Sequence, residues 1–421
     1  MKAQLAYGEG SVCVELPDRC TTIIEPTHTP GLPDERQSVL DALEHPIQTQ
    51  PLRNWIKPGA RVCIVFTDIT RATPNERLIL WLLAYLKVLP PINILLLNGL
   101  GTHRPNTTSE LQQMLTPAVV DNYRVLNHEP KNPDSLVRVG TTRDGTPALL
   151  NRHFVEADVR IVTGFIEPHL FAGFSGGPKG IMPGIAGLET VMSNHGAKNI
   201  SDPEATFGIT RGNPIWEEMR DIALQAGPSF LLNVALNEQR QITGVFAGDL
   251  LAAHEVGCEF VKRSAMQPVD APFDLVLTTN SGYPLDQNLY QGVKGMSAGA
   301  RILKSGGTLI LACECRDGVP ANSSFEQLLH SASKPEEILS RLAAPGFHHP
   351  DQWQAQIQAL IQRQGQVLLY SSLPQQTVRA AHLTPCHDIN LAIQDLVSAD
   401  SNGARIGVLP QGPLTIPYLA R

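Results

Sequence analysis

The 421-residue sequence has a formal net charge of −7, with 42% hydrophobic and 17% charged residues. This composition is typical of globular proteins and excludes a largely disordered chain. The acidic balance argues against nucleic acid as a partner, because neutralising phosphates needs a basic face. We expect two domains, since a single core rarely grows beyond about 250–300 residues.

The sequence also bears on membranes and on the compartment. The longest apolar runs, such as the one from Leu78, are too short and too interrupted to cross a bilayer. The N-terminus lacks the apolar core of a signal peptide. The 7 cysteines are scattered and odd in number, which favours reduced, structural thiols. We therefore expect a cytoplasmic protein with no membrane partner.

The first part of the chain predicts a hairpin followed by alternating strands and helices. Residues Met1–Leu16 alternate like a hairpin that turns at Gly8–Gly10, and a helix follows from Asp34. Continuous apolar runs predict buried strands. The predicted strands are Val62–Phe66, Ile92–Leu97, Arg124–Leu126 and Val159–Val162, with a hairpin over Val137–Leu149. Helices are predicted after Pro74, after the capping residues Thr107–Ser109, and from near Gly187 to His195.

The second part begins with a helix and a strand pair and then repeats the alternation. The predicted elements are a helix over Asn213–Ala226, strands Phe230–Asn237 and Ile242–Ala247, a helix over Asp249–Lys262, and a linker over Met266–Phe273. Strands Leu275–Thr279, Thr308–Cys313, Val367–Tyr370 and Ile406–Leu409 then alternate with helices over Leu289–Leu303 and from Asp351.

This alternation predicts an α/β fold: two α/β domains with mainly parallel or mixed sheets and an active-site cleft between them. The first domain is predicted to span residues 1–268 and the second 269–421, with a C-terminal tail able to return to the first domain.

Three loops that follow predicted strands carry chemically active residues. Because parallel strands end at the same edge of a sheet, these loops should meet in one crevice. Singly, each residue is more often a cap or a surface group. The loops read TDITR, GLGTHR and EPHLFAGFSGGPK, and they contribute Asp68, Arg71, His103, His169 and Lys179.

Known nucleotide and metal motifs do not fit these loops. In a P-loop, glycine precedes the lysine and Ser or Thr follows it, whereas Pro178 and Gly180 flank Lys179. Arg104 replaces the third glycine of a dinucleotide-binding fingerprint. No His/Cys cluster has the spacing of a metal site. Two histidines, His103 and His169, could instead act as base and acid near neutral pH, as racemisation requires. Lys179 could form a covalent attachment or hold an anion.

The ordered set TDITR, GLGTHR, PHLFAGFSGGPKG, SNH, YQGVK and DQW resembles the nickel-dependent lactate racemase family over nearly the whole chain. In that family a nickel pincer nucleotide is tethered to a lysine, and one histidine completes the coordination of nickel. The resemblance implies that Lys179 is the tether, His195 the nickel ligand, and His103 and His169 the catalytic acid/base pair. Cofactor- or substrate-positioning roles are implied for Asp68, Arg71, Tyr290, Gln291, Lys294 and Trp353.

The implied reaction is racemisation of a 2-hydroxy acid, with lactate as the family's default substrate. Hydride transfer to the cofactor would avoid removing the weakly acidic C2 hydrogen as a proton. The implied partners are this small substrate and the enzymes that mature the cofactor. Leu170 and Phe171 are candidates for the substrate-pocket wall. Two alternatives remain: a sugar-acid isomerase or dehydratase without this cofactor, and a non-catalytic protein that binds organic anions.

Overall fold

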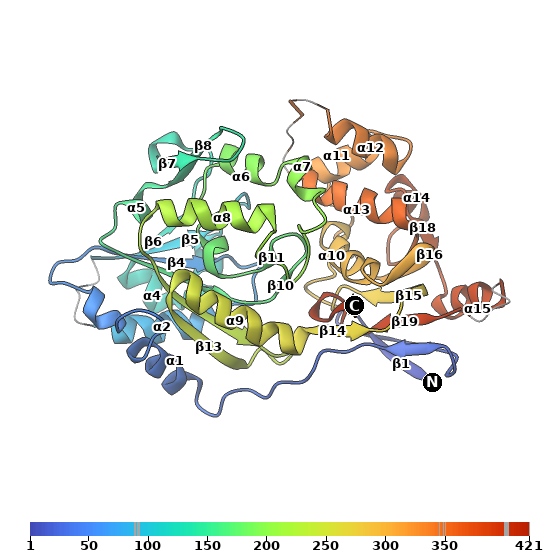
Figure 1. The fold of residues 1–421 in the computed structure, drawn as a ribbon, viewed down its shortest axis with the longest axis horizontal. Helices are drawn as coiled ribbons and strands as arrows, with labels where there is room; N and C mark the ends of the chain where they lie inside the picture. Colours follow the sequence, from blue (N-terminus) through green and yellow to red (C-terminus); the bar gives the residue numbers. More distant parts are fainter. Residues whose placement is uncertain are drawn as a thin grey trace. The chain divides into compact units, whose positions relative to one another are not determined.

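The computed structural model describes residues 1–87, 90, 93–344, 346–347, 349, 351–399 and 404–420. It contains two compact units, each made of a sheet with helices (Figure 1). We call residues 28–195 and 202–263 the central unit, and residues 1–27, 196–201 and 264–421 the terminal unit. The predicted α/β class with parallel and mixed sheets is confirmed.

The grouping of the chain into units differs from the predicted division at residues 268 and 269. The first 27 residues belong with the C-terminal part because β3 (Thr21–Ile23) pairs in parallel with β19 (Ile406–Leu409). The C-terminal strand β20 (Ile416–Leu419) pairs with β14 (Met266–Val269) of the same unit. The predicted linker over Met266–Phe273 is therefore wrong, because a partner at the far end of the chain converts its first half into a strand.

The central unit is built on one six-stranded sheet with the order β13-β12-β9-β4-β5-β6. Only β13 runs antiparallel to its neighbour. The strands are β4 (Val62–Thr67), β5 (Ile94–Gly99), β6 (Arg124–Asn127), β9 (Val159–Phe165), β12 (Phe230–Leu236) and β13 (Ile242–Asp249). The predicted start of the second strand, Ile92, lies outside the described residues.

Helices and two small hairpins complete the central unit. Asp34 and Thr107 accept backbone N–H groups as N-caps, and Thr107 forms the expected capping box with Glu110. The helices are α1 (Glu35–Glu44), α2 (Asn75–Tyr85), α3 (Thr108–Leu115), α4 (Pro117–Asn122), α5 (Arg152–Val155), α6 (Leu188–Asn194), α8 (Pro214–Gln225) and α9 (Leu250–Ala265). The hairpins are β7 (Leu136–Thr141) with β8 (Pro147–Asn151) and β10 (Pro168–His169) with β11 (Gly173–Phe174).

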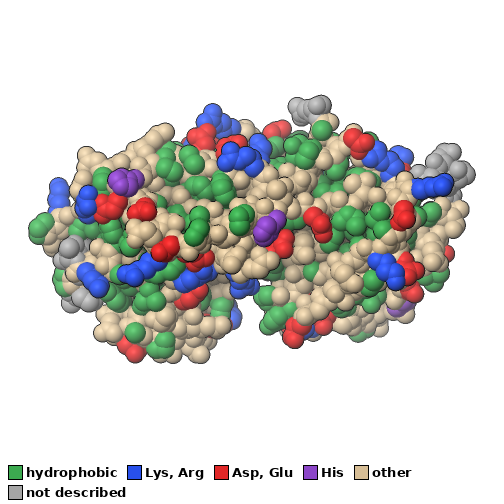
Figure 2. Space-filling view, turned by 90° about the horizontal axis from the view of Figure 1, so that it is seen from below, with side chains coloured by type: hydrophobic (Ala, Val, Ile, Leu, Met, Phe, Trp, Pro, Cys, Tyr) green, Lys and Arg blue, Asp and Glu red, His purple; other side chains and the backbone are tan. Residues whose placement is uncertain are grey.

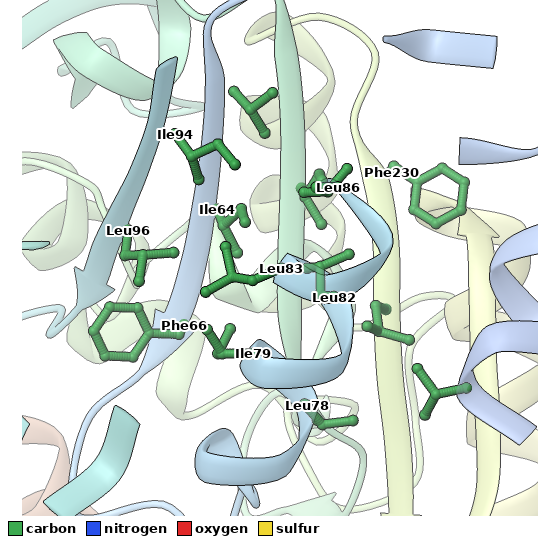
Figure 3. Close-up of a cluster of buried hydrophobic side chains, with 14 of the residues drawn as sticks. Ile64, Phe66, Leu78, Ile79, Leu82, Leu83, Leu86, Ile94, Leu96 and Phe230 are labelled. Atoms are coloured by element: carbon green, nitrogen blue, oxygen red, sulfur yellow. The ribbon is translucent and has the colours of Figure 1, made fainter. Parts of the chain in front are cut away.

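The core of the central unit lies between α2 and the sheet. Leu78, Ile79 and Leu82 of α2 contact the apolar side chains of β4 and β5 (Figure 3). Ile64 and Phe66 of β4 belong to the same fully buried cluster. Burying each such side chain stabilises the fold by about 1.5–3 kcal/mol, so this contact fixes the strands from which the loops of interest emerge.

The terminal unit has a second six-stranded sheet, all parallel, with the order β18-β17-β16-β15-β19-β3. Its remaining strands are β15 (Phe273–Thr279), β16 (Leu303–Ala312), β17 (Gln366–Tyr370) and β18 (Thr384–Cys386), and the predicted N-terminal hairpin forms from β1 (Lys2–Tyr7) and β2 (Gly10–Glu15). Its helices are α7 (Ala197–Ile200), α10 (Leu289–Ala300), α11 (Ser324–His330), α12 (Pro335–Leu342), α13 (Gln352–Gln364), α14 (Gln375–Ala380) and α15 (Ile389–Ala399).

The helix predicted over Leu289–Leu303 is shorter than expected, because β16 already begins at Leu303. On the face shown in Figure 2, acidic and basic side chains are interspersed. Within the described part of the chain, we find no helix with the length and apolarity that a membrane span requires.

Candidate active site

The order in which the chain adds strands to the central sheet reverses between β4 and β9. From β4 the chain first builds outward through β5 and β6, and later builds the other side through β9 and β12. Open α/β sheets bind ligands outside the carboxyl ends of the strands at such a switch point. Asp68 directly follows β4 and His169 lies in the hairpin that follows β9, so two of the predicted residues lie on loops at this position.

Asp68 and His103 are in direct contact. Oδ2 of the buried Asp68 lies 2.8 Å from Nδ1 of His103, whose side chain is 37% exposed. Burial alone would raise the pKa of Asp68. The hydrogen bonds from His103 and Thr70 and the charges of His103 and Arg71 outweigh burial and bring this pKa well below its usual value. The ionised carboxylate accepts the Nδ1 proton, which places the lone pair of a neutral His103 on Nε2, the nitrogen available for a base.

Lys179 lies in a short 3₁₀ turn over Gly177–Gly180, and side chains from β12 and α9 contact the backbone of this segment. The N–H of Gly177 donates to Oδ1 of Asn233 on β12 over 2.8 Å. Gly177 has φ +53°, and a Cβ there would lie 2.4 Å from Cγ of His254. Only glycine therefore fits at this position.

His254 of α9 supports the same turn. Its Nε2 lies 2.9 Å from the carbonyl oxygen of Ser175, to which it can donate a proton. Burial lowers the pKa of His254 to about 4, so the ring is neutral at physiological pH. The backbone of the glycine-rich loop is thus fixed by hydrogen bonds with two buried polar side chains, Asn233 and His254.

His169 and His195 both contact the ring of Phe171. The ring centroids of His169 and Phe171 are 4.6 Å apart, and those of Phe171 and His195 are 4.9 Å apart, both edge to face. The N–H of Ala172 donates to Nδ1 of His169 over 3.2 Å. A neutral His169 therefore carries its proton on Nε2, the opposite tautomer from His103.

His195 is the C-cap of α6 and is buried. Burial and the nearby charge of Lys179 lower the pKa of His195 to about 3. Its Nδ1 lies 2.9 Å from Oδ1 of Asn194. A neutral ring with its proton on Nδ1 presents a lone pair at Nε2, which is the form in which histidine binds metals.

The loop after β5 is joined to the glycine-rich segment, since the N–H of Gly101 donates to the carbonyl of Gly184 over 2.8 Å. The central unit thus groups Asp68 with Arg71 and His103. Lys179 is near enough to His195 for its charge to lower the pKa of that ring. His169 and His195 are linked by their contacts with the ring of Phe171.

The remaining predicted residues lie in the terminal unit. Tyr290, Gln291 and Lys294 are half-buried in the first turns of α10, and Trp353 is buried in α13, which packs on α10. A Cβ at Gly295 would lie 2.1 Å from the carbonyl oxygen of Thr279, so glycine lets α10 pack closely on β15. The hydroxyl of Tyr290 donates to Oδ1 of Asp351 over 3.1 Å. The predicted contribution of Tyr290, Gln291, Lys294 and Trp353 to an active-site cleft stays a prediction.

The sequence did not single out Glu218, Asn233 or His254 as supports of the site. Glu218 had a detectable signal, because it lies on the same face of α8 as the buried Ile215, Met219 and Ile222. A charged residue on an apolar helix face predicts a hydrogen-bond partner inside the protein, because burying a charge without one is costly. Among the described residues there is no group of three or more His, Cys, Asp or Glu side chains that could hold a metal ion.

Comparisons with known proteins identify the family of the chain. Residues 7–208 match the family model for the lactate racemase N-terminal domain, and residues 269–416 match the model for the lactate racemase C-terminal domain. The chain is 35% identical to the lactate racemase of Thermoanaerobacterium thermosaccharolyticum over 97% of both chains. It is 36% identical to that of Lactiplantibacillus plantarum over 90% of both.

Solved structures give the same result. The lactate racemase apoprotein from T. thermosaccharolyticum superposes with a TM-score of 0.91 at 34% identity, covering 99% of this chain and 100% of that one. A protein from Thermotoga maritima, with a TM-score of 0.70 and 21% identity over 93% of this chain and 100% of its own, shares the fold. The chain is therefore an isomerase of the racemase class. It belongs to the lactate racemase family.

Proposed function

We propose that this enzyme interconverts the enantiomers of a 2-hydroxy acid, with lactate as the first candidate, using a nickel pincer nucleotide tethered to Lys179. The activity named for its relatives supports the reaction class. One observation carries the cofactor assignment: the buried ring of His195 lies close enough to Lys179 for the lysine charge to lower its pKa, and its Nδ1 lies 2.9 Å from the amide oxygen of Asn194. With the ring proton on Nδ1, Nε2 is the nitrogen that would bind nickel.

The residues present fit such a group. Lys179 would form the covalent link, and His195 would supply one nitrogen ligand. When bound, the nickel pincer nucleotide would accept the C2 hydrogen of the substrate as a hydride and return it. The glycines before Lys179 let the loop pack closely against Asn233 and His254, which fixes the backbone that carries Lys179.

The protein's own histidines would handle the hydroxyl proton. Nε2 of His103 would take this proton from one enantiomer, and the carboxylate of Asp68 would stabilise the resulting imidazolium. His169, with its proton on Nε2, would donate a hydrogen bond to the same substrate oxygen. When hydrogen returns to C2, the imidazolium of His103 would return the proton to this oxygen. A 2-keto acid is planar at C2, so return of hydrogen to its opposite face yields the other enantiomer.

The test uses the full chain produced together with the cofactor's maturation enzymes. We expect added mass at Lys179, bound nickel, and loss of optical rotation with one member of a panel of 2-hydroxy acids. Lys179→Ala should lack the added mass. His103→Ala and His169→Ala should keep the cofactor and lose racemisation.

Other outcomes would contradict the proposal. Turnover of a sugar acid by protein without added mass would identify an isomerase or dehydratase that does not use this cofactor. Binding of organic anions by fully loaded protein without turnover would identify a binding protein. Near-normal activity of either histidine variant would exclude the acid/base pair.

A further inference from the structure

Three buried side chains at the end of α6 and on α8 form a continuous hydrogen-bonded chain. His195, Asn194 and Glu218 are 4%, 0% and 2% exposed. Nδ1 of His195 lies 2.9 Å from Oδ1 of Asn194, and Nδ2 of Asn194 donates to Oε2 of Glu218 over 2.8 Å. The chain connects the end of α6 with the buried face of α8.

The orientation of the Asn194 amide follows from its partners. Its Nδ2 faces two acceptors, Oε2 of Glu218 and the carbonyl oxygen of Ile215 at 3.1 Å. A flipped amide would place its oxygen against both of these oxygens. The amide oxygen must therefore face His195, and this requires a proton on Nδ1 of that ring.

Glu218 is suited to impose this direction. Its other oxygen accepts the backbone N–H of Arg143 over 2.6 Å, so both carboxylate oxygens act as acceptors. In the described part of the chain, Glu218 belongs to none of the ion pairs, whereas the neighbouring Glu217 pairs with Arg143. Burying a carboxylate without a cation costs stability, and the fixed orientation of Asn194 is what this placement provides.

We propose that Glu218, acting through Asn194, is a positioning residue that holds His195 in the tautomer whose Nε2 can bind a metal ion. This inference rests on the proposed function of His195 as the nickel ligand. Partners that hydrogen-bond the second nitrogen of a metal-binding histidine fix its tautomer and orientation, and their loss typically weakens metal binding by about 10–100-fold.

Glu218→Gln is the sharpest substitution. The glutamine keeps the volume of the side chain but replaces one of the two acceptor oxygens with an NH₂ group, which must donate to an acceptor. If its carbonyl accepts from Arg143, its NH₂ group faces Asn194. The Asn194 amide can then flip so that its oxygen accepts from this NH₂ group, and of the two oxygens that opposed the flip only the Ile215 carbonyl remains. The flipped amide presents its own NH₂ group to Nδ1 of His195 and moves the ring proton to Nε2.

The first experiment needs no cofactor. The full-length apoprotein is labelled with ¹⁵N-histidine, His195→Gln identifies the His195 signals, and two-bond ¹⁵N–¹H correlations report the tautomer. We expect the Nδ1–H form in the unsubstituted protein and a shift toward Nε2–H in Glu218→Gln. The matched control is Glu217→Gln, on the same helix, which should leave the tautomer unchanged. An Nε2–H form in the unsubstituted protein, or an unchanged tautomer in Glu218→Gln, would overturn the proposal.

Two further variants keep the test decisive. In Asn194→Asp combined with Glu218→Gln, the polarity of the contact is reversed and a carboxylate takes the place of the Asn194 amide oxygen as acceptor of the Nδ1 proton, so the Nδ1–H form should return. If Glu218→Gln does not fold, Asn194→Ser removes the connecting amide. A mixture of tautomers is then expected, and a pure Nδ1–H form would contradict the inference.

The second readout is nickel retention in the loaded protein. Glu218→Gln should lose nickel to a chelator about 10–100-fold faster than Glu217→Gln, and equal rates would exclude a role of Glu218 in metal binding. Failure of the proposed function would be distinct: His195→Gln would then retain nickel fully, while the tautomer shift in Glu218→Gln would persist.

Discussion

Oδ2 of Asp68 lies 2.8 Å from Nδ1 of His103, although 35 residues separate them in the chain. Asp68 follows β4 and His103 follows β5, two adjacent parallel strands. The parallel pairing of these strands brings the two loops to the same edge of the central sheet, where the contact forms. The ionised carboxylate prepares His103 to accept a proton at Nε2.

Asp68→Asn should lower kcat by about 10²–10⁴-fold, because an amide can donate to Nδ1 and reverse the tautomer of His103. The measurement is the initial rate of racemisation by loaded enzyme. Asp158→Asn is the control, since Asp158 also pairs with a basic side chain, Arg61, but at the surface. Equal rates for the two variants would show that the Asp68 carboxylate plays no part in the reaction.

Gly177→Ala should lower the free energy of unfolding by about 2–5 kcal/mol, because a positive φ and a clash with the ring of His254 act together. Gly212→Ala separates these effects. Gly212 has φ +84°, but a Cβ there would meet nothing within 4 Å, so only the backbone strain of about 1–2 kcal/mol should appear. Urea unfolding of both variants measures the difference. Equal losses would mean that His254 yields without cost.

Phe171→Leu should remove the edge-to-face contacts with His169 and His195 and cost about 1–3 kcal/mol of stability. Activity should fall as well, because the ring fixes the positions of both histidines. Phe246→Leu is the control, since Phe246 is similarly buried and contacts Phe260 instead. Urea unfolding and racemisation rates are compared. Parallel effects on both properties in the two variants would argue against a positioning role of Phe171.

The stability of the apoprotein should decrease as the pH falls from about 6.5 to 5. Burial is the main cause that lowers the pKa of His128, His195 and His254, to about 4, 3 and 4. In this range the three histidines bind protons in the unfolded chain but not in the folded chain. Each histidine therefore lowers the free energy of unfolding by roughly 1.4 kcal/mol for each unit by which the pH falls.

Urea unfolding across that pH range measures this slope. His128→Gln removes one of the three titrating groups and should reduce the slope by about one proton equivalent. A stability that stays constant between pH 6.5 and 5 would mean that the rings are protonated in the folded state.

The sequence predicted the central sheet well because its buried parallel strands are continuous apolar runs, as at Val62–Phe66. It missed β3 and β18, which have three residues each and no local pattern. β3 is a strand only because residues 406–408 pair with it. The same reason explains the error at Met266–Val269, whose partner is β20.

The site was predictable to the extent that sheet topology determines it. Loops after adjacent parallel strands must emerge at one edge, and Asp68 and His103 are accordingly neighbours. Their direct hydrogen bond depends on loop conformations that no periodicity encodes. The role of Asn194 was equally hidden, although it stands next to His195 in the sequence, because the orientation of its amide depends on Glu218 from another helix.

The parallel pairing of Thr21–Ile23 with Ile406–Val408 has a consequence for how the enzyme is made. During synthesis the N-terminal strand emerges from the ribosome first, yet it must wait for nearly the entire chain before its neighbour exists. The terminal unit is built from both ends of the chain, so a fragment cut after residue 263 contains the central sheet whole but separates the residues of the terminal sheet. Premature termination near residue 400 would remove β19 and β20 and leave β3, β14 and β15 each without a neighbouring strand, and such a product is a natural target for proteolysis and aggregation.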